Sequence, residues 1–195
     1  MIVHPVGRRA LLVEVPGTAE AQALYAELLR RRVPCTDLVP AARTVLIDGL
    51  ADPARWAAEI PHWMIPPVPE RDGQLIEIPV VYDGEDLAEV SERWGGPADG
   101  IHASFEYRVA FCGFAPGFGY LTGLPAQYHV PRLSSPRPGV PAGSVAVAGE
   151  YTGIYPRSSP GGWRLLGHTS VQLWDAGREP PALLVPGTRV RFVPA

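Results

Sequence analysis

Residues 113–125 read GFAPGFGYLTGLP, and this stretch decides how the second half of the chain is interpreted. Glycine and proline are mixed in it with aromatic residues, which is typical of a rigid loop between short strands. The same mixture recurs in residues 136–149, PRPGVPAGSVAVAG, and in residues 152–169, TGIYPRSSPGGWRLLGHT. Near these loops, Tyr107 and Val109 alternate with polar or small residues. Short strands joined by long irregular loops predict a closed or nearly closed β-barrel.

Further elements are expected around these loops. Residues 144–148 form a small-residue strand, and the alternation in residues 171–173 and 190–192 indicates two more strands. A short helix is expected near residues 86–94. The second half is therefore expected to be mainly β.

The first 80 or so residues alternate predicted strands and helices. Thr18 can cap a helix that Pro34 ends, and Asp52 followed by Pro53 opens a second helix through Ile60. The expected strands are residues 9–15, 36–39, 44–47 and 75–82. The order β-α-β-β-α-β is that of a ferredoxin-like sandwich.

A proline-rich stretch, Pro61–Gly73, separates the two patterns. Such a stretch is stiff and extended, and we interpret it as the crossing between domains. The alternative is a surface loop within one domain. The expected organisation is a small α+β domain over residues 1–72 and a mainly β domain over residues 73–195.

Composition excludes several classes of function. A net charge of -3 argues against nucleic-acid and anionic-membrane partners. Cys35 and Cys112 lack CxxC neighbours and the five histidines are scattered, so no metal site is expected. No stretch has the roughly 18 unbroken apolar residues of a membrane span, and no signal core is evident, so a cytoplasmic protein is expected.

The three loops carry the candidate ligand-binding residues. In the first loop, proline and glycine fix the backbone and aromatic rings offer flat walls. In the second, Arg137 can hold an anion in a fixed fork. In the third, a Ser-Pro-Gly-Gly turn can expose consecutive N–H groups to an anion. The candidates are Phe114, Pro116, Gly117, Phe118, Tyr120, Ser144, Tyr155, Ser159, Pro160, Gly161, Gly162 and Trp163.

Structural alternatives stand beside each of these interpretations. The first loop can be a barrel corner packed by its own aromatics, Arg137 a solvated loop residue, and the third loop a wide turn anchored by Trp163. His102, with Arg108 nearby, is a candidate acid or base. A histidine before a strand is otherwise a hydrogen-bonded structural residue.

The three loops, in this order, closely resemble the family of allophanate hydrolase subunit 1. That family includes the B subunit of bacterial ATP-dependent 5-oxoprolinase and the kinase inhibitor KipI. The resemblance also takes in residues 77–84, residues 102–108 and the closing residues 186–192. It covers most of the chain from about Leu75 onward.

The resemblance implies a small α+β domain followed by a cyclophilin-like barrel. It implies a small-molecule substrate and an enzyme subunit, inactive alone, that works with a related C-type subunit (allophanate hydrolase subunit 2-like) and an A-type subunit. Such a complex phosphorylates 5-oxoproline on the way to L-glutamate, using ATP with Mg. The alternatives are a urea carboxylase-type carboxyltransferase subunit, which needs biotin, and a KipI-like histidine kinase inhibitor.

The resemblance also implies that the candidate residues line one cleft facing the partner. On residue chemistry, Arg137 and the Ser159–Trp163 turn are the anion holders there, and His102 and Arg108 are polar catalytic or positioning groups. The sequence departs from the family pattern at Phe105, where proline or a small residue is common. It also departs at Gly119, where proline is common, and at His168, where arginine is common. Because the family's arginine is absent at His168, anion binding can be weaker there, and the resemblance does not determine which substrate is bound.

Overall fold

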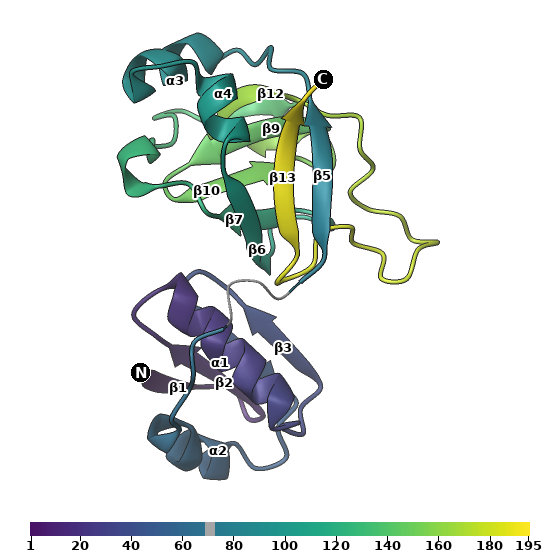
Figure 1. The fold of residues 1–195 in the computed structure, drawn as a ribbon. Helices are drawn as coiled ribbons and strands as arrows, with labels where there is room; N and C mark the ends of the chain where they lie inside the picture. Colours follow the sequence, from purple (N-terminus) through teal and green to yellow (C-terminus); the bar gives the residue numbers. More distant parts are fainter. Residues whose placement is uncertain (69–72) are drawn as a thin grey trace. The chain divides into compact units, whose positions relative to one another are not determined.

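The computed structural model describes residues 1–68 and 73–195 (Figure 1). The chain divides into two compact units, Met1–Asp72 and Gly73–Ala195. Pro69 and the last residues of the expected crossing before Gly73 lie outside the described residues. Each unit has its own buried apolar core.

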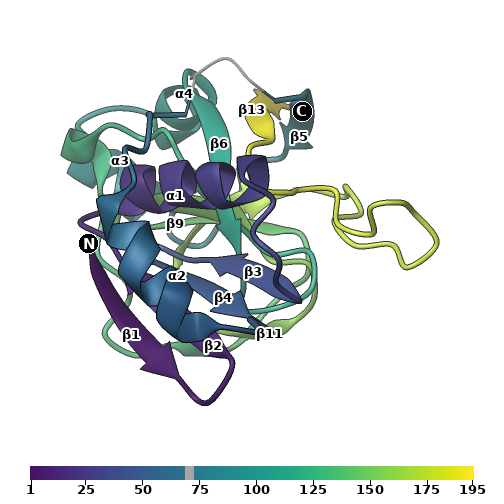
Figure 2. The same ribbon diagram turned by 90° about the horizontal axis from the view of Figure 1, so that it is seen from below.

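The first unit is a four-stranded antiparallel sheet with two helices. Its elements are β1 (Ile2–Val6), β2 (Ala10–Glu14), α1 (Thr18–Arg30), β3 (Asp37–Pro40), β4 (Thr44–Asp48), α2 (Pro53–Glu59) and the 3₁₀ turn η1 (Ile60–His62). The strand order is β1-β2-β4-β3. Figure 2 shows α1 and α2 over one face of this sheet.

Local sequence signals set the helices of this unit. Asp52 caps α2 by accepting a hydrogen bond from the Arg55 N–H at 3.1 Å, with Pro53 in the first turn, as expected. The expected Thr18 cap of α1 is wrong, because Gly17 occupies the cap position without a side-chain hydrogen bond and Thr18 is the first helical residue. Leu24 and Leu28 of α1 pack on the sheet, so helix and sheet bury one core.

The first unit departs from the expected β-α-β-β-α-β order. It begins with β1, which the sequence did not indicate, and β1 forms a hairpin with β2. The expected last strand, β5 (Leu75–Val80), belongs instead to the sheet of the second unit. There it pairs in parallel with β13 (Arg189–Pro194).

The second unit is built on a seven-stranded sheet in the order β12-β9-β10-β7-β6-β13-β5. Besides β5 and β13, its strands are β6 (Glu106–Cys112), β7 (Gly119–Thr122), β9 (Ser144–Ala148), β10 (Tyr151–Ile154) and β12 (Arg164–His168). A separate ribbon joins β8 (Arg137–Val140) to β11 (Ser159–Gly161). Its helical pieces are α3 (Leu87–Trp94), α4 (Ala98–Ala103) and η2 (Ala126–Tyr128).

This sheet curls until its two edges almost meet. Just past β5, Val81 and His168 exchange two backbone hydrogen bonds of 2.9 Å each. The Gly84 N–H then donates to the Leu166 carbonyl at 3.0 Å. These bonds join the first and last strands of the sheet, so the predicted nearly closed barrel is confirmed.

One expected strand is absent. Residues 171–173 form no strand, and the only pairing in this part of the described chain is an isolated bridge between Trp174 and Ala182. In Figure 1 the segment between β12 and β13 leaves the barrel as a long loop. Val171 and Leu173 still pack on the barrel core, which explains their apolar alternation. Among the described residues, no helix has the length and apolar character required to cross a membrane.

His102 lies fully buried in the barrel core, on α4. Its ring packs on Phe192 and Tyr107, with centroids 4.5 and 5.0 Å away. The Thr152 hydroxyl donates to a backbone carbonyl, so its oxygen accepts from His102 Nε2–H at 2.9 Å. Nδ1 then accepts from the Tyr82 hydroxyl at 2.8 Å. The imidazole is therefore neutral, and both of its nitrogens are hydrogen-bonded within the core, so His102 is a structural residue.

Burial of His102 predicts that the stability of the second unit falls in acid. Burial lowers the pKa of His102 from 6.5 to about 3. The folded state thus binds fewer protons than the unfolded state, so stability falls as pH drops below about 6.5. Between about pH 7.5 and about pH 5.5 this group should remove roughly 1.4 kcal/mol from the free energy of unfolding.

Urea denaturation at both pH values checks this, with the chain compared to His102→Gln. The variant should be less stable at the higher pH, because it loses the buried imidazole, but should lose about 1.4 kcal/mol less on acidification. An equal acid loss in both proteins would show that His102 is not the sensitive group.

Candidate functional site

The candidate site lies on the outer face of the barrel. Along β9, Val145 and Val147 point into the barrel core, while Ala146 and Ala148 face outward. The outward alanines belong to a second apolar cluster with Phe118, Tyr155 and Trp163. Small residues on the strand therefore leave room for large rings above it.

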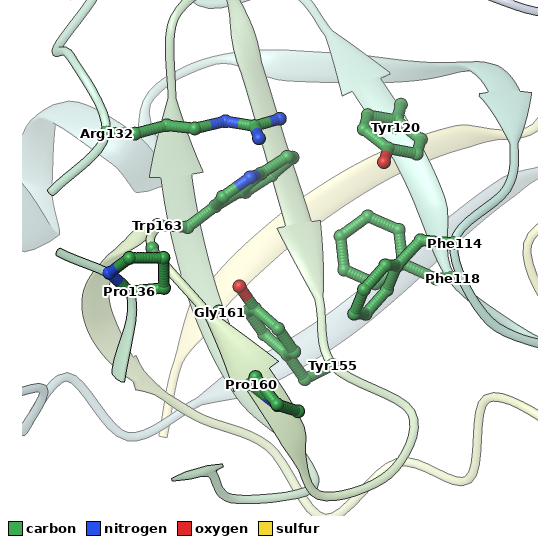
Figure 3. Close-up of a pocket in the computed structure, with 10 residues that line it drawn as sticks. Phe114, Phe118, Tyr120, Arg132, Pro136, Tyr155, Pro160, Gly161 and Trp163 are labelled. Atoms are coloured by element: carbon green, nitrogen blue, oxygen red, sulfur yellow. The ribbon is translucent and has the colours of Figure 1, made fainter. Parts of the chain in front are cut away.

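These rings surround a pocket of about 270 Å³. Figure 3 shows its walls. They come from the β6–β7 loop and β7, from the segment between β10 and β12, and from the chain before β8. The lining residues are Phe114, Phe118, Tyr120, Arg132, Pro136, Tyr155, Pro160, Gly161, Gly162 and Trp163. The lining is mostly apolar, with two phenols and one cation.

Phe118 is the centre of the aromatic wall. Its ring makes edge contacts with Tyr120, Tyr155 and Trp163, with centroids 5.0, 5.5 and 5.4 Å away. Offset and edge-on ring pairs of this kind are favourable beyond their buried area. Because Phe118, Tyr155 and Trp163 are buried, the wall is formed before any ligand arrives.

Phe114 stands at the mouth of the pocket. Its side chain is 58% exposed, and its ring lies edge-on to Phe118 with centroids 5.3 Å apart. Its φ of 66° is in the left-handed region, which is uncommon for a bulky residue, and strained residues of this kind cluster at active sites and ligand-binding loops. The Gly113 N–H donates to the Phe118 carbonyl at 3.2 Å and closes this loop.

Two glycines allow the close packing of the wall. A Cβ on Gly161 would lie 2.3 Å from the Tyr155 hydroxyl oxygen. A Cβ on Gly153 would lie 3.1 Å from atoms of both Phe118 and Trp163. Both positions therefore require the absence of a side chain, which the Gly-rich composition of the third loop indicated.

Arg132 supplies the positive charge of the pocket. Its guanidinium lies over the Trp163 ring, 5.9 Å from the centroid, as Figure 3 shows. None of the lining residues is a carboxylate. The lining therefore combines apolar walls with one positive charge and no negative one.

The two phenols can act as hydrogen-bond donors. Burial raises the pKa of Tyr120, and the charge of Arg132 acts in the opposite direction. Burial also raises the pKa of Tyr155, against a backbone hydrogen bond with Trp163 and the charge of Arg132. Both hydroxyls are protonated at neutral pH and can donate to a ligand oxygen.

Most of the residues expected to bind a ligand do meet at this pocket. Those that line it are Phe114, Phe118, Tyr120, Tyr155, Pro160, Gly161, Gly162 and Trp163. Three loops that are distant in the sequence therefore form one concave wall. Whether they bind a ligand stays a prediction.

Four expected ligand contacts lie elsewhere. Pro116 and Gly117 form the turn beside the lining, where a Cβ on Gly117 would lie 3.0 Å from Trp174 Cβ. Ser144 is buried in β9, and its carbonyl accepts from the Tyr155 N–H at 2.9 Å. Ser159 lies in β11 next to the lining, with its hydroxyl buried.

Arg137 is a support of the pocket and does not line it. Its Nη2 donates to both Asp86 carboxylate oxygens at 2.8 and 2.9 Å, and its Nε donates to Glu85 at 3.1 Å. Its Nη1 donates to the Trp163 carbonyl at 3.3 Å. Two carboxylates already neutralise the guanidinium, which corrects both the anion-holding role and the alternative of a solvated arginine.

His102 and Arg108 do not reach the pocket either. His102 is 0% exposed inside the barrel, so it cannot contact a ligand on the outer face. This corrects its expected place in the cleft and matches the structural alternative. Arg108 lies on β6 opposite Arg189 and Thr122, and it is not among the lining residues.

Arg132 and Pro136 are lining residues that the sequence did not single out. Arg132 precedes the second loop by four residues, in PRLSSPRPG, where Arg137 has the same Pro-Arg context. The distinguishing signal is a pairing with Glu85 and Asp86, some fifty residues away, which only the fold reveals.

Known proteins match nearly the whole of this chain. A family model described as carboxyltransferase domain, subdomain C and D, matches residues 1–184. The B subunit of 5-oxoprolinase from Escherichia coli O157:H7 is 40% identical, covering 97% of this chain and 94% of that protein. The 5-oxoprolinase B subunit of Haemophilus influenzae is 36% identical, covering 99% and 97%.

Solved structures agree with the fold. The crystal structure of TTHA0988 is 40% identical with a TM-score of 0.74, covering 96% of this chain but only 40% of that one. This chain thus spans less than half of that protein. The Kluyveromyces lactis urea carboxylase has a TM-score of 0.72 at 19% identity, over 99% of this chain and 21% of the enzyme, which is a likeness of fold alone.

The resemblance predicted from the three loops is therefore confirmed along nearly the whole chain. This chain belongs to the family that comprises the 5-oxoprolinase B subunits and allophanate hydrolase subunit 1.

Proposed function

We propose that this chain is a subunit of an ATP-dependent 5-oxoprolinase, inactive alone. The observation that carries the proposal is the similarity, over almost the full length of both proteins, to relatives named as the B subunit of 5-oxoprolinase. The name of those relatives implies a complex of several subunits. We propose a C-type and an A-type subunit as partners, with ATP and Mg as co-substrate and phosphorylation of 5-oxoproline as the step that this chain serves.

The pocket supports a role in that reaction. It is preformed, concave and mostly apolar, with a few polar groups aimed into it, which are the usual features of a small-molecule site. Its mouth is open, so a second polypeptide can close it over a ligand.

The test is reconstitution with the C-type and A-type subunits. Release of ADP that depends on 5-oxoproline, together with glutamate formation, is the expected result. Turnover that needs a biotinylated protein, or binding to a histidine kinase without turnover, would replace the proposal by the corresponding alternative.

A matched pair of glycine variants connects the activity to the pocket. Gly161→Ala should abolish most of the activity, because the new methyl group meets the buried Tyr155 ring. Gly139→Ala, in the facing strand of the same ribbon, has no atom within 4 Å of the new Cβ and should leave activity unchanged. Thermal melting of both variants distinguishes loss of the site from loss of the fold.

A further inference from the structure

The arginines near the pocket differ in their carboxylate partners. Of the arginines near it, Arg137 is neutralised by Asp86 and Glu85, and Arg164 is paired with Glu89. Arg132 has no ion pair with any carboxylate of residues 1–68 or 73–195. The Arg132 guanidinium is therefore available to bind an anionic ligand.

The pocket does not fit a nucleotide triphosphate with Mg. A triphosphate needs several cations or a loop of backbone N–H groups, and Mg needs carboxylate oxygens. The lining offers one arginine and no carboxylate. The Ser159–Gly161 stretch, expected as an anion-binding turn, is instead strand β11 paired with β8. Its volume of about 270 Å³ also lies below the roughly 300–1,000 Å³ that is usual for drug-sized ligands.

We propose that this pocket binds a small ring bearing a single carboxylate, with Arg132 as the anion anchor, and that ATP binds elsewhere in the complex. The ring lies against Phe114, Phe118 and Trp163, and the Tyr120 and Tyr155 hydroxyls donate to its polar atoms. The inference rests on the proposed function, because it names 5-oxoproline as the occupant of this chain's site.

The chemistry of 5-oxoproline matches each part of the lining. Its carboxylate suits the guanidinium fork, which can hold both oxygens. Its two methylene groups suit the aromatic wall, and its lactam oxygen can accept from a phenol. A neutral lactam lacks only the first of these contacts.

Isothermal titration calorimetry with the full chain tests the inference, using 5-oxoproline, pyrrolidone (the same ring without the carboxylate) and ATP with Mg. We expect 5-oxoproline to bind at least about tenfold more tightly than pyrrolidone, and ATP not to bind. Arg132→Gln should weaken the binding of 5-oxoproline at least about tenfold and leave the affinity for pyrrolidone unchanged. Arg157→Gln, an exposed arginine outside the lining, is the matched control.

Several results overturn the inference. These are displacement of 5-oxoproline by ATP, an equal loss of both lactams in Arg132→Gln, and no loss in that variant. If the chain alone binds no lactam, Arg132→Gln must raise the KM for 5-oxoproline in the reconstituted complex without changing the KM for ATP, and an unchanged KM refutes it. If the complex is active and Arg132→Gln leaves the KM for 5-oxoproline unchanged, this inference is refuted and the proposed function stands. If the chain binds the lactam but the complex has no oxoprolinase turnover, the proposed function is refuted and this inference stands.

Discussion

Replacing Gly167 with alanine is expected to lower the free energy of unfolding of the barrel by about 3 kcal/mol or more. Gly167 lies in β12, where the two edges of the sheet meet. A Cβ at this position would lie 2.1 Å from the Val81 carbonyl oxygen and 2.8 Å from Tyr82 Cα. Both are backbone atoms, so no side chain can turn aside to relieve the clash.

Relief of that clash requires the edges to separate. The pair of 2.9 Å hydrogen bonds between Val81 and His168 would then be lost, at about 1 kcal/mol each, in addition to the 1–3 kcal/mol typical of overpacking. Urea denaturation measures the change. Gly139→Ala adds the same methyl group in open space and should shift the midpoint little. Equal stability of the two variants would mean that edge closure contributes little to the barrel.

Elements set by local signals could be predicted from the sequence. The Asp52-Pro53 pair gave the start of α2, and the small-residue run at 144–148 coincides with β9. Helix α4 could not be found in this way, because it has six residues and no side-chain cap. Capping and alternation are properties of neighbouring residues, so they remain readable without the fold.

Local sequence signals do not show which strands pair with each other. The apolar alternation of β5 correctly indicates a strand, but alternation does not specify its neighbour. Its partner β13 comes at the other end of the chain, and the pair is parallel, so no turn signal connects them. For that reason the β-α-β-β-α-β pattern counts β5 with the first unit, although the domain boundary expected at residue 72 places it in the second.

The candidate site shows the same division between local and distant information. Glycine, proline and aromatic residues gather within single loops, so their joint role in a wall was predictable. The role of an arginine depends on which carboxylates face it. Arg137 and Arg132 have similar neighbours in sequence, but only Arg137 meets Asp86 and Glu85 in the fold.

Asp86→Ala is the second substitution with a large expected effect, a loss of roughly 2–4 kcal/mol. Asp86 is 6% exposed and accepts hydrogen bonds from Arg137 and, at 2.7 Å, from the Leu165 N–H. Burial lowers the pKa of Arg137, but the hydrogen bonds and charges of Asp86 and Glu85 outweigh it, so this pKa is raised. Removal of Asp86 therefore leaves a charged guanidinium without its main partner.

A double-mutant cycle with Arg137→Ala separates the pair from its surroundings. Because the Arg137 side chain is 20% exposed, water offsets part of the penalty, and the coupling energy should be about 2 kcal/mol. The exposed pair of Glu77 and Arg191, 3.5 Å apart in the same barrel, should show a coupling below about 1 kcal/mol. Similar coupling in both cycles would refute a special role for Asp86.

The same cycle reports on the pocket, since Arg137 also donates to the Trp163 carbonyl. Loss of Asp86 should loosen this wall and change the fluorescence of Trp163, taken as the difference from the same protein with Trp163→Phe, since the chain has five tryptophans. The Glu77→Ala variant should not change it. If the stability falls while the fluorescence of Trp163 is unchanged, the ion pair holds the ribbon without ordering the wall. If both change together, the buried pair is what places an aromatic ring opposite Phe118, and the cation left for a ligand is Arg132.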